Sequence, residues 1–541
     1  MKGHKALARA ISACDIATMF GVMGDANMLH ITDYIRDGGR FVNSVHEAGA
    51  VSMADGFGRL SGTVGIATVT HGPGLTNTLT PLVEAVRARS RLILITAETM
   101  ERPNLAQQFD IRSFANVAGA DYRRVTSAEL LGREVTSAIR ATAEARRPLV
   151  LNVPMPSQLG EVGEEGFAFA EPYYPLRSQP DRDAIANVVR VLLDAKRPLV
   201  LIGRGAVESG GVSAIQRLAT HLGAPVATTL LAQGSVSSAP LSIDVMGGLS
   251  TPLAKEVVQS SDCIISFGAS LNPFTTDGKR LIADKVVVQI DDRVDAFGRF
   301  CTANVEVLAD ARLAAEELLG ALEDVVARPG DDTLAERIAV YDRSEQIDDT
   351  SATGTIDIRT ATAVLDRLLP EERLVVTDGG RQTIAAWRFI RSRHAWHFTH
   401  TASFGSIGLG IPTAIGAALA QPDSVPVAIC GDGGGMMSII EFSTAVREQI
   451  PIVVVVMNDG CYGSEYTKLD DAGVDPAYSL MNWPSFAELA VALGGDGVRV
   501  TSIPELEAAI QRASELRWPL LIEVVADPAE NPERPVGMWH P

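Results

Sequence analysis

Two short motifs, Gly431-Asp432-Gly433 and Asn458-Asp459-Gly460, constrain the fold of this chain most strongly. The residues around them predict a strand over 425–430, a glycine turn, a helix over about 438–447 and a second strand over 452–457. Both strands are continuously apolar, as expected for a parallel sheet that is covered on both faces. Asp432 and Asn458 would then follow the carboxyl ends of two strands, where open α/β sheets bind ligands.

The chemistry of these motifs suits a metal-bound diphosphate. The Asp432 carboxylate, the Asn458 amide oxygen and the backbone carbonyl of Gly460 are hard oxygen ligands, which suit a Mg²⁺ that keeps water and phosphate oxygens in its other positions. Glycine at 433 and 434 lets the backbone approach a phosphate, and the following helix N-terminus favours negative charge. For a single motif of this kind, a tight turn with a capping aspartate is the purely structural alternative.

Bulk properties narrow the class of protein. A length of 541 residues predicts about three domains. The net charge of −19 argues against a nucleic-acid partner, because phosphate binding needs a basic face. The five cysteines are far apart and form no CxxC pair, which favours a reducing compartment. With no apolar run near the ~18 residues of a membrane helix and no signal segment, we expect a cytoplasmic protein without a membrane partner.

Two linker-like stretches, at 171–175 and 328–332, divide the chain into three units. Each unit contains a proline followed by an apolar, strand-like run, at 148–151, 198–201 and 519–522. Units of alternating helix and strand indicate an α/β protein with three doubly wound parallel-sheet domains. We predict domains at 1–170, 183–327 and 350–541.

Four further glycine- or alanine-rich motifs occur along the chain. They are His46-Glu47-Ala48-Gly49-Ala50, Ala54-Asp55-Gly56-Phe57-Gly58-Arg59, Gly72-Pro73-Gly74-Leu75-Thr76-Asn77 and Gly405-Ser406-Ile407-Gly408. With the two motifs above, they resemble thiamine-diphosphate-dependent enzymes of the pyruvate decarboxylase, acetolactate synthase and benzaldehyde lyase superfamily, over essentially the whole chain. The resemblance implies that the three domains are pyrimidine-binding, central and diphosphate-binding, and that the cofactors are thiamine diphosphate and Mg²⁺.

The resemblance also implies roles for individual residues. Glu47 would hydrogen-bond the pyrimidine ring of the cofactor and stabilise its imino tautomer; the alternative is a helix-start glutamate stabilised by the helix dipole. Ile407 would support the bent shape of the cofactor, and the Gly405 carbonyl would accept a hydrogen bond from its amino group. The other residues that would line the cofactor are Gly74, Asn77, Gly379, Gly380, Gly431, Asp432, Gly433, Gly434, Asn458, Gly460 and Tyr462.

Four residues are candidates for substrate-facing acid or base groups. Asp25 matches a proton-handling aspartate of the related decarboxylases, with a turn or helix-cap role as the alternative. His71 stands where related synthases carry a small residue, and it is either an acid/base group or a structural histidine. Gln108 resembles the pocket glutamine of the synthases, although the local alignment allows a shift of one residue. Glu465 lies seven residues after Asn458, whereas the decarboxylases place their active-site glutamate at six.

Departures from the family pattern bear on the reaction. Residues 98–103 lack the His-His pair of the pyruvate-type decarboxylases. The central unit lacks the Arg-Phe-Asp-Asp run of flavin-carrying acetolactate synthases, so FAD is the less favoured alternative cofactor. The resemblance therefore implies an acetolactate-synthase-like C–C lyase or carboligase acting on a 2-keto acid or related carbonyl compound.

The alternatives are a 2-keto acid decarboxylase that releases an aldehyde and a non-catalytic scaffold of the same fold. In the family, one active site is shared by two subunits. One subunit supplies the residue that matches Glu47 and the other supplies the residue that matches Asp432, which implies a homodimer or a dimer of dimers.

Overall fold

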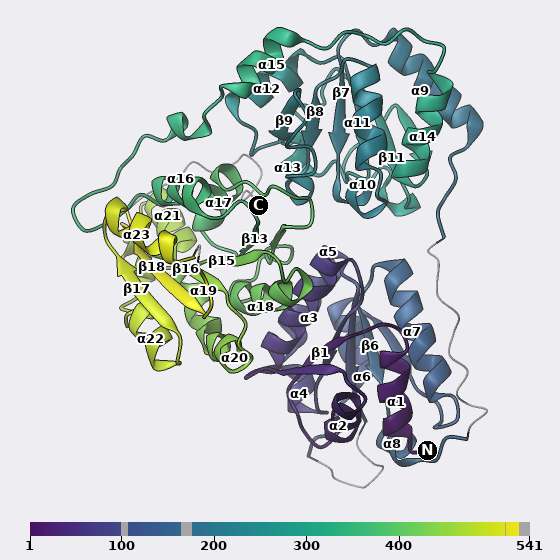
Figure 1. The fold of residues 1–541 in the computed structure, drawn as a ribbon, viewed down its shortest axis with the longest axis vertical. Coiled ribbons are helices and arrows are strands. Elements are labelled where there is room, and N and C mark those ends of the chain that lie inside the picture. Colours follow the sequence, from purple (N-terminus) through teal and green to yellow (C-terminus); the bar gives the residue numbers. More distant parts are fainter. Residues whose placement is uncertain (99–105, 164–175, 514, 530–541) are drawn as a thin grey trace. The chain divides into compact units, whose positions relative to one another are not determined.

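The structure is a computed structural model that describes residues 1–98, 106–163, 176–513 and 515–529. Within these residues the chain forms three six-stranded sheets (Figure 1). Its described residues divide into two compact units, one within 1–163, 350–383 and 399–529 and the other within 176–349 and 384–398. Among the described helices, none has both the length and the apolar composition needed to cross a membrane.

The first sheet lies in the first unit and has the strand order β2-β1-β3-β4-β6-β5. Its strands run parallel and are β1 (Thr18–Gly21), β2 (Arg40–Asn43), β3 (Gly65–Thr68), β4 (Leu92–Thr96), β5 (Asp121–Arg124) and β6 (Leu149–Asn152). The helices of this domain are α1 (Gly3–Ser12), α2 (Met28–Arg36), α3 (Glu47–Ser61), α4 (Pro73–Thr76), α5 (Leu79–Ala88), α6 (Ile111–Ala118), α7 (Leu131–Ala145) and α8 (Met155–Leu159).

The third sheet also lies in the first unit, apart from Phe398 of β14, and its order is β14-β13-β15-β16-β18-β17. Numbered within its own domain, this is the order 2-1-3-4-6-5 of the first sheet. Its strands are β13 (Arg373–Thr377), β14 (Phe398–His400), β15 (Val425–Gly431), β16 (Val453–Asn458), β17 (Asp496–Val500) and β18 (Leu520–Val525). Its helices are α16 (Ile358–Leu368), α18 (Gly410–Ala420), α19 (Asp432–Ser438), η5 (Ile439–Glu441), α20 (Phe442–Arg447), α21 (Gly463–Asp471), η6 (Pro476–Ser479), α22 (Phe486–Ala492) and α23 (Ile503–Ala513). Helix α17 (Gln382–Phe389) begins in the first unit, and its residues from Ile384 on belong to the second.

The second unit contains the middle sheet, with the order β12-β11-β10-β7-β8-β9. Numbered within the domain, this is 3-2-1-4-5-6, an order typical of nucleotide-binding folds. The strands are β7 (Pro198–Ile202), β8 (Val226–Thr228), β9 (Ser242–Val245), β10 (Cys263–Phe267), β11 (Val286–Asp291) and β12 (Val305–Leu308). The helices are α9 (Arg182–Asp194), α10 (Arg204–Glu208), α11 (Val212–His221), η2 (Leu230–Ala232), α12 (Pro252–Ser260), α13 (Pro273–Thr276), η3 (Val294–Ala296), α14 (Ala311–Ala321), α15 (Asp332–Ala339) and η4 (Arg343–Gln346).

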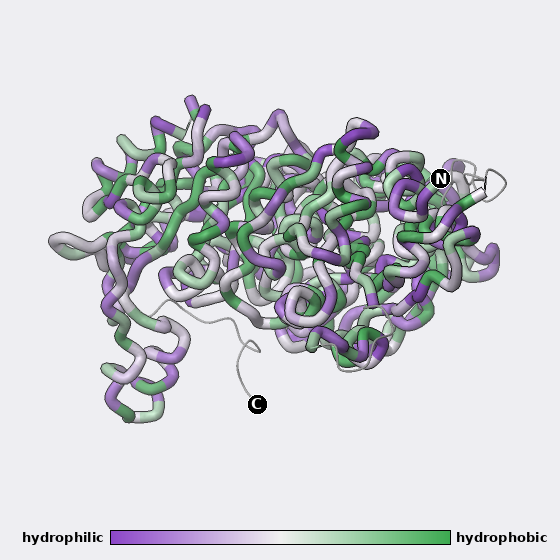
Figure 2. The backbone as a smooth tube through the Cα atoms, turned by 90° about the horizontal axis from the view of Figure 1, so that it is seen from below, coloured by the Kyte–Doolittle hydropathy of each residue, from purple (hydrophilic) through white to green (hydrophobic). Residues whose placement is uncertain are grey.

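Alternating strand residues face opposite cores. In β4, Leu92 and Leu94 lie in one buried cluster and Ile93 and Ile95 in another. β7 repeats this arrangement in the middle domain, so both sheets are covered on both faces. Along the helices, hydrophobic and hydrophilic residues are interleaved, as amphipathic cover requires (Figure 2). The predicted fold class, with three parallel α/β domains, is confirmed, whereas the boundaries 1–170, 183–327 and 350–541 stay a prediction.

One local prediction was wrong. The helix after β15 begins at Asp432, not near residue 438, and a 3-10 turn separates it from α20. Glycine is a poor helix former, which favoured a turn over residues 433–435. Tertiary packing requires glycine there, because a Cβ on Gly433 would lie 2.7 Å from the Tyr462 ring and one on Gly434 would lie 2.6 Å from the Asp378 carboxylate.

Helices α3 and α18 connect the first and third sheets within the first unit. A Cβ on Gly416 would lie 1.8 Å from the Met53 carbonyl oxygen, and one on Gly56 would lie 2.3 Å from that of Thr413. Small residues therefore let the two backbones approach closely, and the residues around these contacts share one buried core. This packing fixes the domain that carries Glu47 against the domain that carries Asp432.

Candidate active site

The candidate residues gather at the carboxyl edges of the first and third sheets. Gly21 pairs with Asn43 and with Thr68, so β1, β2 and β3 end side by side. The segments that follow these strands carry Asp25, Glu47 and His71. In the third sheet Gly431 pairs with Met457, which places Asp432 level with Asn458. Both sets thus lie at the strand ends where open α/β sheets bind ligands.

Asp432 is the first residue of α19 and is almost fully buried. Its Oδ1 accepts a hydrogen bond from the Gly433 amide at 2.7 Å, and its Oδ2 accepts one from the Cys461 amide at 3.1 Å. Burial and the neighbouring Asp459 carboxylate raise the pKa of Asp432 to about 7. A bound cation would favour the charged form, so the environment of this carboxylate suits a metal ligand.

Asn458 is the last residue of β16, and its amide is oriented by Glu523 on β18. The Nδ2 atom donates to Glu523 Oε1 at 2.9 Å, while Oδ1 accepts from the Gly460 amide at 3.2 Å. The Asn458 oxygen therefore faces the 458–460 turn. The Gly460 carbonyl accepts from the Met481 amide at 2.7 Å, which leaves its second lone pair for another partner.

A buried ion pair holds the same turn from the other side. The Arg381 guanidinium bonds the Asp459 carboxylate, with Nε at 3.1 Å from Oδ2, and both side chains are at least nine-tenths buried. Gly460 has a φ of +65°, a backbone conformation that glycine adopts without strain. The turn between Asn458 and Cys461 is therefore rigid before any ligand binds.

Asp378 organises the loop that carries Ile407. This carboxylate is fully buried at the end of β13 and accepts hydrogen bonds from Thr401 Oγ1 and the Gly408 amide, both at 2.7 Å. The backbone around Gly379 lies close to the same loop, because a Cβ there would be 2.6 Å from the Ser406 carbonyl oxygen and 3.2 Å from the Ile407 side chain. Burial raises the pKa of Asp378, and the hydrogen bonds from the loop oppose that rise.

Glu47 lies in a second cluster, in the first domain. It begins α3, is half-buried, and its Oε2 accepts a hydrogen bond from Asn77 Nδ2 at 2.9 Å. A Cβ on Gly74 would lie 3.4 Å from Glu47 Oε1. The structure thus brings Glu47, Gly74 and Asn77 together, although they are spread over thirty residues of sequence.

His71 pairs with a neighbour of the predicted glutamine. Its Nε2 lies 2.7 Å from Gln107 Oε1, and both Gln107 and Gln108 are exposed. The role of Gln108 stays a prediction, and the contact that the structure shows for His71 is to the neighbouring Gln107. Among the described residues, His71 Nδ1 is buried and has no hydrogen-bond partner, so one polar atom of this side chain is left for a ligand.

The other two substrate-facing candidates are more exposed. Asp25 is an exposed residue of the turn between β1 and α2. Glu465 lies in the first turn of α21 with 58% of its side chain exposed, and its Oε1 is 3.4 Å from Lys468 Nζ. The segment that lacks the His-His pair is described only at Glu98, because residues 99–103 lie outside the described residues.

Three residues of this site were not predicted from the sequence. Asp378 and Arg381 flank the Gly379-Gly380 pair, and Glu523 lies in an apolar strand. The sequence offered one signal for these residues: Glu523 interrupts an apolar strand. A buried glutamate needs a polar partner, so this position could have been singled out. The contacts of Asp378 and Arg381 join segments about thirty and eighty residues apart, which periodicity does not reveal.

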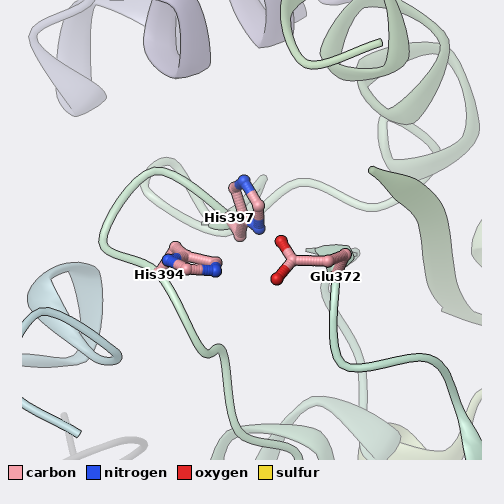
Figure 3. A group of neighbouring side chains, drawn as sticks. All are labelled: Glu372, His394 and His397. Carbon is pink, nitrogen blue, oxygen red and sulfur yellow. The ribbon is translucent and has the colours of Figure 1, made fainter. Parts of the chain in front are cut away.

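The turns after β7 and β10 make their contacts within the second unit. The Gly205 amide donates to the Gly268 carbonyl at 3.0 Å, which joins the turns after β7 and β10. The Arg204 guanidinium stacks over the Trp396 ring at 4.0 Å from its centroid. Nearby in sequence, His394 and His397 meet edge to face with centroids 4.8 Å apart (Figure 3). Figure 3 also labels Glu372, which belongs to the first unit, so we assign no metal site to this group.

Comparison with known proteins identifies the same three domains. A family model described as the thiamine pyrophosphate enzyme N-terminal TPP binding domain matches residues 1–113. The models for the central domain and the C-terminal TPP binding domain match residues 185–318 and 378–524.

Curated relatives match nearly the whole chain. A sulfoacetaldehyde acetyltransferase of Alcaligenes xylosoxydans xylosoxydans is 28% identical over 96% of this chain and 91% of the relative. A probable acetolactate synthase large subunit of Methanococcus aeolicus is 25% identical over 98% of this chain and 92% of the relative. The chloroplastic acetolactate synthase of Arabidopsis thaliana is 27% identical over 98% and 82%.

Proposed function

We propose a reaction for this protein on one premise: the chain belongs to the thiamine-diphosphate-dependent enzymes. On that premise it is an acetolactate-synthase-like carboligase. It cleaves a C–C bond next to the carbonyl of a 2-keto acid or related compound and transfers the fragment to an acceptor. The observation that carries the proposal is the complete set of cofactor motifs, combined with relatives over the whole chain that are named as acetolactate synthase and acetyltransferase.

The residues present fit the cofactor. Asp432, the Asn458 amide oxygen and the second lone pair of the Gly460 carbonyl offer the hard oxygen ligands of a Mg²⁺ that binds a diphosphate. The bare backbone of residues 433–434 and the N-terminus of α19 suit the phosphate oxygens. Ile407 and the Gly405 carbonyl would hold the middle of the cofactor, and Glu47 would bond its pyrimidine ring. Thiamine diphosphate supplies the electron sink for C–C cleavage when it is bound.

The residues facing the substrate favour transfer to an acceptor over release of an aldehyde. His71, with Nε2 on Gln107 and a second nitrogen without a described partner, is the best placed proton donor and acceptor of the first domain. Asp25 and Glu465 are exposed, and residues 98–103 lack the histidine pair of the related decarboxylases. A carboligase needs fewer protonation steps at the reacting carbon than a decarboxylase.

The test is a product screen by mass spectrometry. The purified protein with thiamine diphosphate and Mg²⁺ is given a panel of 2-keto acids, with and without 2-keto acid, aldehyde and phosphate acceptors. We expect acceptor-dependent products. Release of free aldehyde at a rate independent of acceptor would identify a decarboxylase instead. The absence of both a product and a saturable, Mg²⁺-dependent circular dichroism signal with the cofactor would indicate a scaffold.

The site is proposed to be completed by a second copy of the chain. Several large apolar side chains next to the cofactor motifs are 42–56% exposed: Val45, Phe404, Met437 and Ile440. An exposed apolar group of this kind, beside a polar site, is typical of an interface. A homodimer, or a pair of such dimers, would cover it and would join the Glu47 half of one subunit to the Asp432 half of the other.

Mixed variants test this arrangement. Glu47→Gln and Asp432→Ala proteins should each be inactive, yet a mixture under conditions of subunit exchange should regain up to about a quarter of wild-type activity. The reason is that a mixed dimer contains one site with both residues intact. Verified exchange without recovery, or an active monomer in light scattering, would contradict the shared site.

A further inference from the structure

Two buried glutamates outside the cofactor motifs each reach into the other domain of the first unit. Glu84 lies on α5 of the first domain with 1% of its surface exposed, and Glu441 lies in η5 of the third domain with 2% exposed. A buried carboxylate is costly unless charged or polar partners compensate its lost hydration. The partners of these two groups therefore indicate why glutamate occupies both positions.

Glu441 binds the backbone directly before Glu47. Its Oε1 accepts from the His46 amide at 2.9 Å, and its Oε2 accepts from the Val45 amide at 3.2 Å. The Thr444 hydroxyl donates to the same Oε2 at 2.7 Å and fixes the carboxylate. A Cβ on Gly49 would lie 2.2 Å from Oε1, so the first turn of α3 packs directly on this group.

Glu84 makes the reciprocal contact with the loop that carries Ile407. Its Oε1 accepts from the Ser403 amide at 3.1 Å, and its Oε2 accepts from the Phe404 amide at 2.6 Å. The Arg59 guanidinium also lies 3.3 Å from Oε1. Residues 403 and 404 directly precede Gly405 and lie four and three residues before Ile407, and residues 45 and 46 directly precede Glu47.

The two contacts are equivalent in topology. The first and third sheets have the same strand order, and each glutamate lies on the helical segment that follows the third strand of its domain. Each loop that it binds follows the second strand of the other domain. The two contacts thus occupy corresponding places in two domains that have the same strand order.

We propose that Glu441 and Glu84 are positioning residues: Glu441 fixes the loop that presents Glu47, and Glu84 fixes the loop that presents Ile407. The inference rests on the proposed roles of Glu47 and Ile407. Two amides bound to one buried carboxylate cannot rotate independently, so the backbone entering each cofactor loop has a single orientation. A cofactor contact made by the next residues would then be preorganised.

The discriminating variant is Glu441→Gln. A glutamine has the same length, but only one of its two terminal atoms accepts, so one of the Val45 and His46 amides would face an NH₂ group. Glu448→Gln, at the end of α20, is the matched control, because its side chain lies near Arg40 and not at these amides. Glu441→Asp keeps the charge, but its side chain is one methylene shorter and cannot reach both amides. This variant replaces Glu441→Gln in the experiment if the glutamine variant does not fold.

The first readout is hydrogen exchange by mass spectrometry on the cofactor-free protein. We expect the amides of residues 45 and 46 to exchange about tenfold faster or more in Glu441→Gln, with residues 403 and 404 unchanged. Glu84→Gln should give the converse pattern. The second readout is kinetic: kcat should fall about tenfold or more, with KM for the carbonyl substrate within about threefold of wild type.

Unchanged exchange at 45 and 46 would overturn the proposal. Faster exchange with unchanged kcat and unchanged thiamine diphosphate affinity would also overturn it, since the contact would then only join two domains. If the wild-type protein turns over no carbonyl substrate, the proposed reaction fails, while exchange and cofactor affinity still decide the role of Glu441.

Discussion

Glu47→Gln protein is expected to fold as the wild type does and to lose at least about 99% of its turnover. The substitution keeps the size of the side chain and its contact with Asn77 Nδ2, because the amide oxygen can still accept that hydrogen bond at 2.9 Å. The amide cannot supply the proton that a carboxyl group shares with a pyrimidine nitrogen. Acid–base groups in this position contribute about 10²-fold or more, which sets the size of the loss.

The measurements are steady-state turnover and a thermal unfolding curve for both proteins. Glu507→Gln is the control, because Glu507 lies on α23 and pairs only with the exposed Arg367 in the described contacts. A loss of activity accompanied by unfolding would say nothing of chemistry. Turnover above about a tenth of wild type in folded Glu47→Gln would refute the assigned role.

Local sequence patterns were enough to predict the strand ends that carry the site. The strand predicted over 425–430 is β15, which runs one residue further, to Gly431. The second strand, predicted over 452–457, corresponds to β16, which spans Val453–Asn458. These predictions succeed because a strand buried on both faces must be apolar throughout, and polar residues can appear only beyond its ends.

The groups that orient the site could not be predicted in this way. Glu441 looks like an ordinary residue of an amphipathic helix, and only the packing of α3 against the third domain brings it to the amides of residues 45 and 46. Asp378 stands in a glycine-rich turn, where a capping role is the simplest interpretation. Their partners are set by contacts between distant segments, and one sequence without its fold carries no record of such contacts.

The position of Gln107 beside His71 depends on a related feature of the fold. Gln107 and Gln108 have the same side chain, so the sequence does not show which of them lies beside His71. The path of the backbone determines this. In the structure the backbone of Gln107 lies against Gly72, whose φ is +62°, and a Cβ on Gly72 would be 2.9 Å from the Gln107 carbonyl oxygen. The turn at Gly72, directly before Pro73, lies against Gln107, the glutamine that contacts His71.

Asp432→Ala is expected to lose Mg²⁺-dependent cofactor binding by at least about 100-fold in affinity. Outer-shell partners of a metal already contribute about 10–100-fold, and removal of a direct carboxylate ligand should cost more. Asn458→Ala should act in the same direction, because the amide oxygen is lost and Glu523 loses the Nδ2 donor at 2.9 Å. Asp496→Ala is the control, since that aspartate is exposed on β17 and pairs with Arg512.

Calorimetric titration of thiamine diphosphate, with and without Mg²⁺, measures this effect directly. The cofactor-free Asp432→Ala protein should remain folded, because the substitution removes a buried carboxylate that lies beside the Asp459 charge. If the variant loses cofactor affinity but unfolds at the same temperature as the wild type, Asp432 acts as a ligand. If Asp432 had only a structural role, its loss would lower the unfolding temperature. Unchanged affinity in both variants would exclude these residues as metal ligands and would move the diphosphate site away from the carboxyl edge of the third sheet.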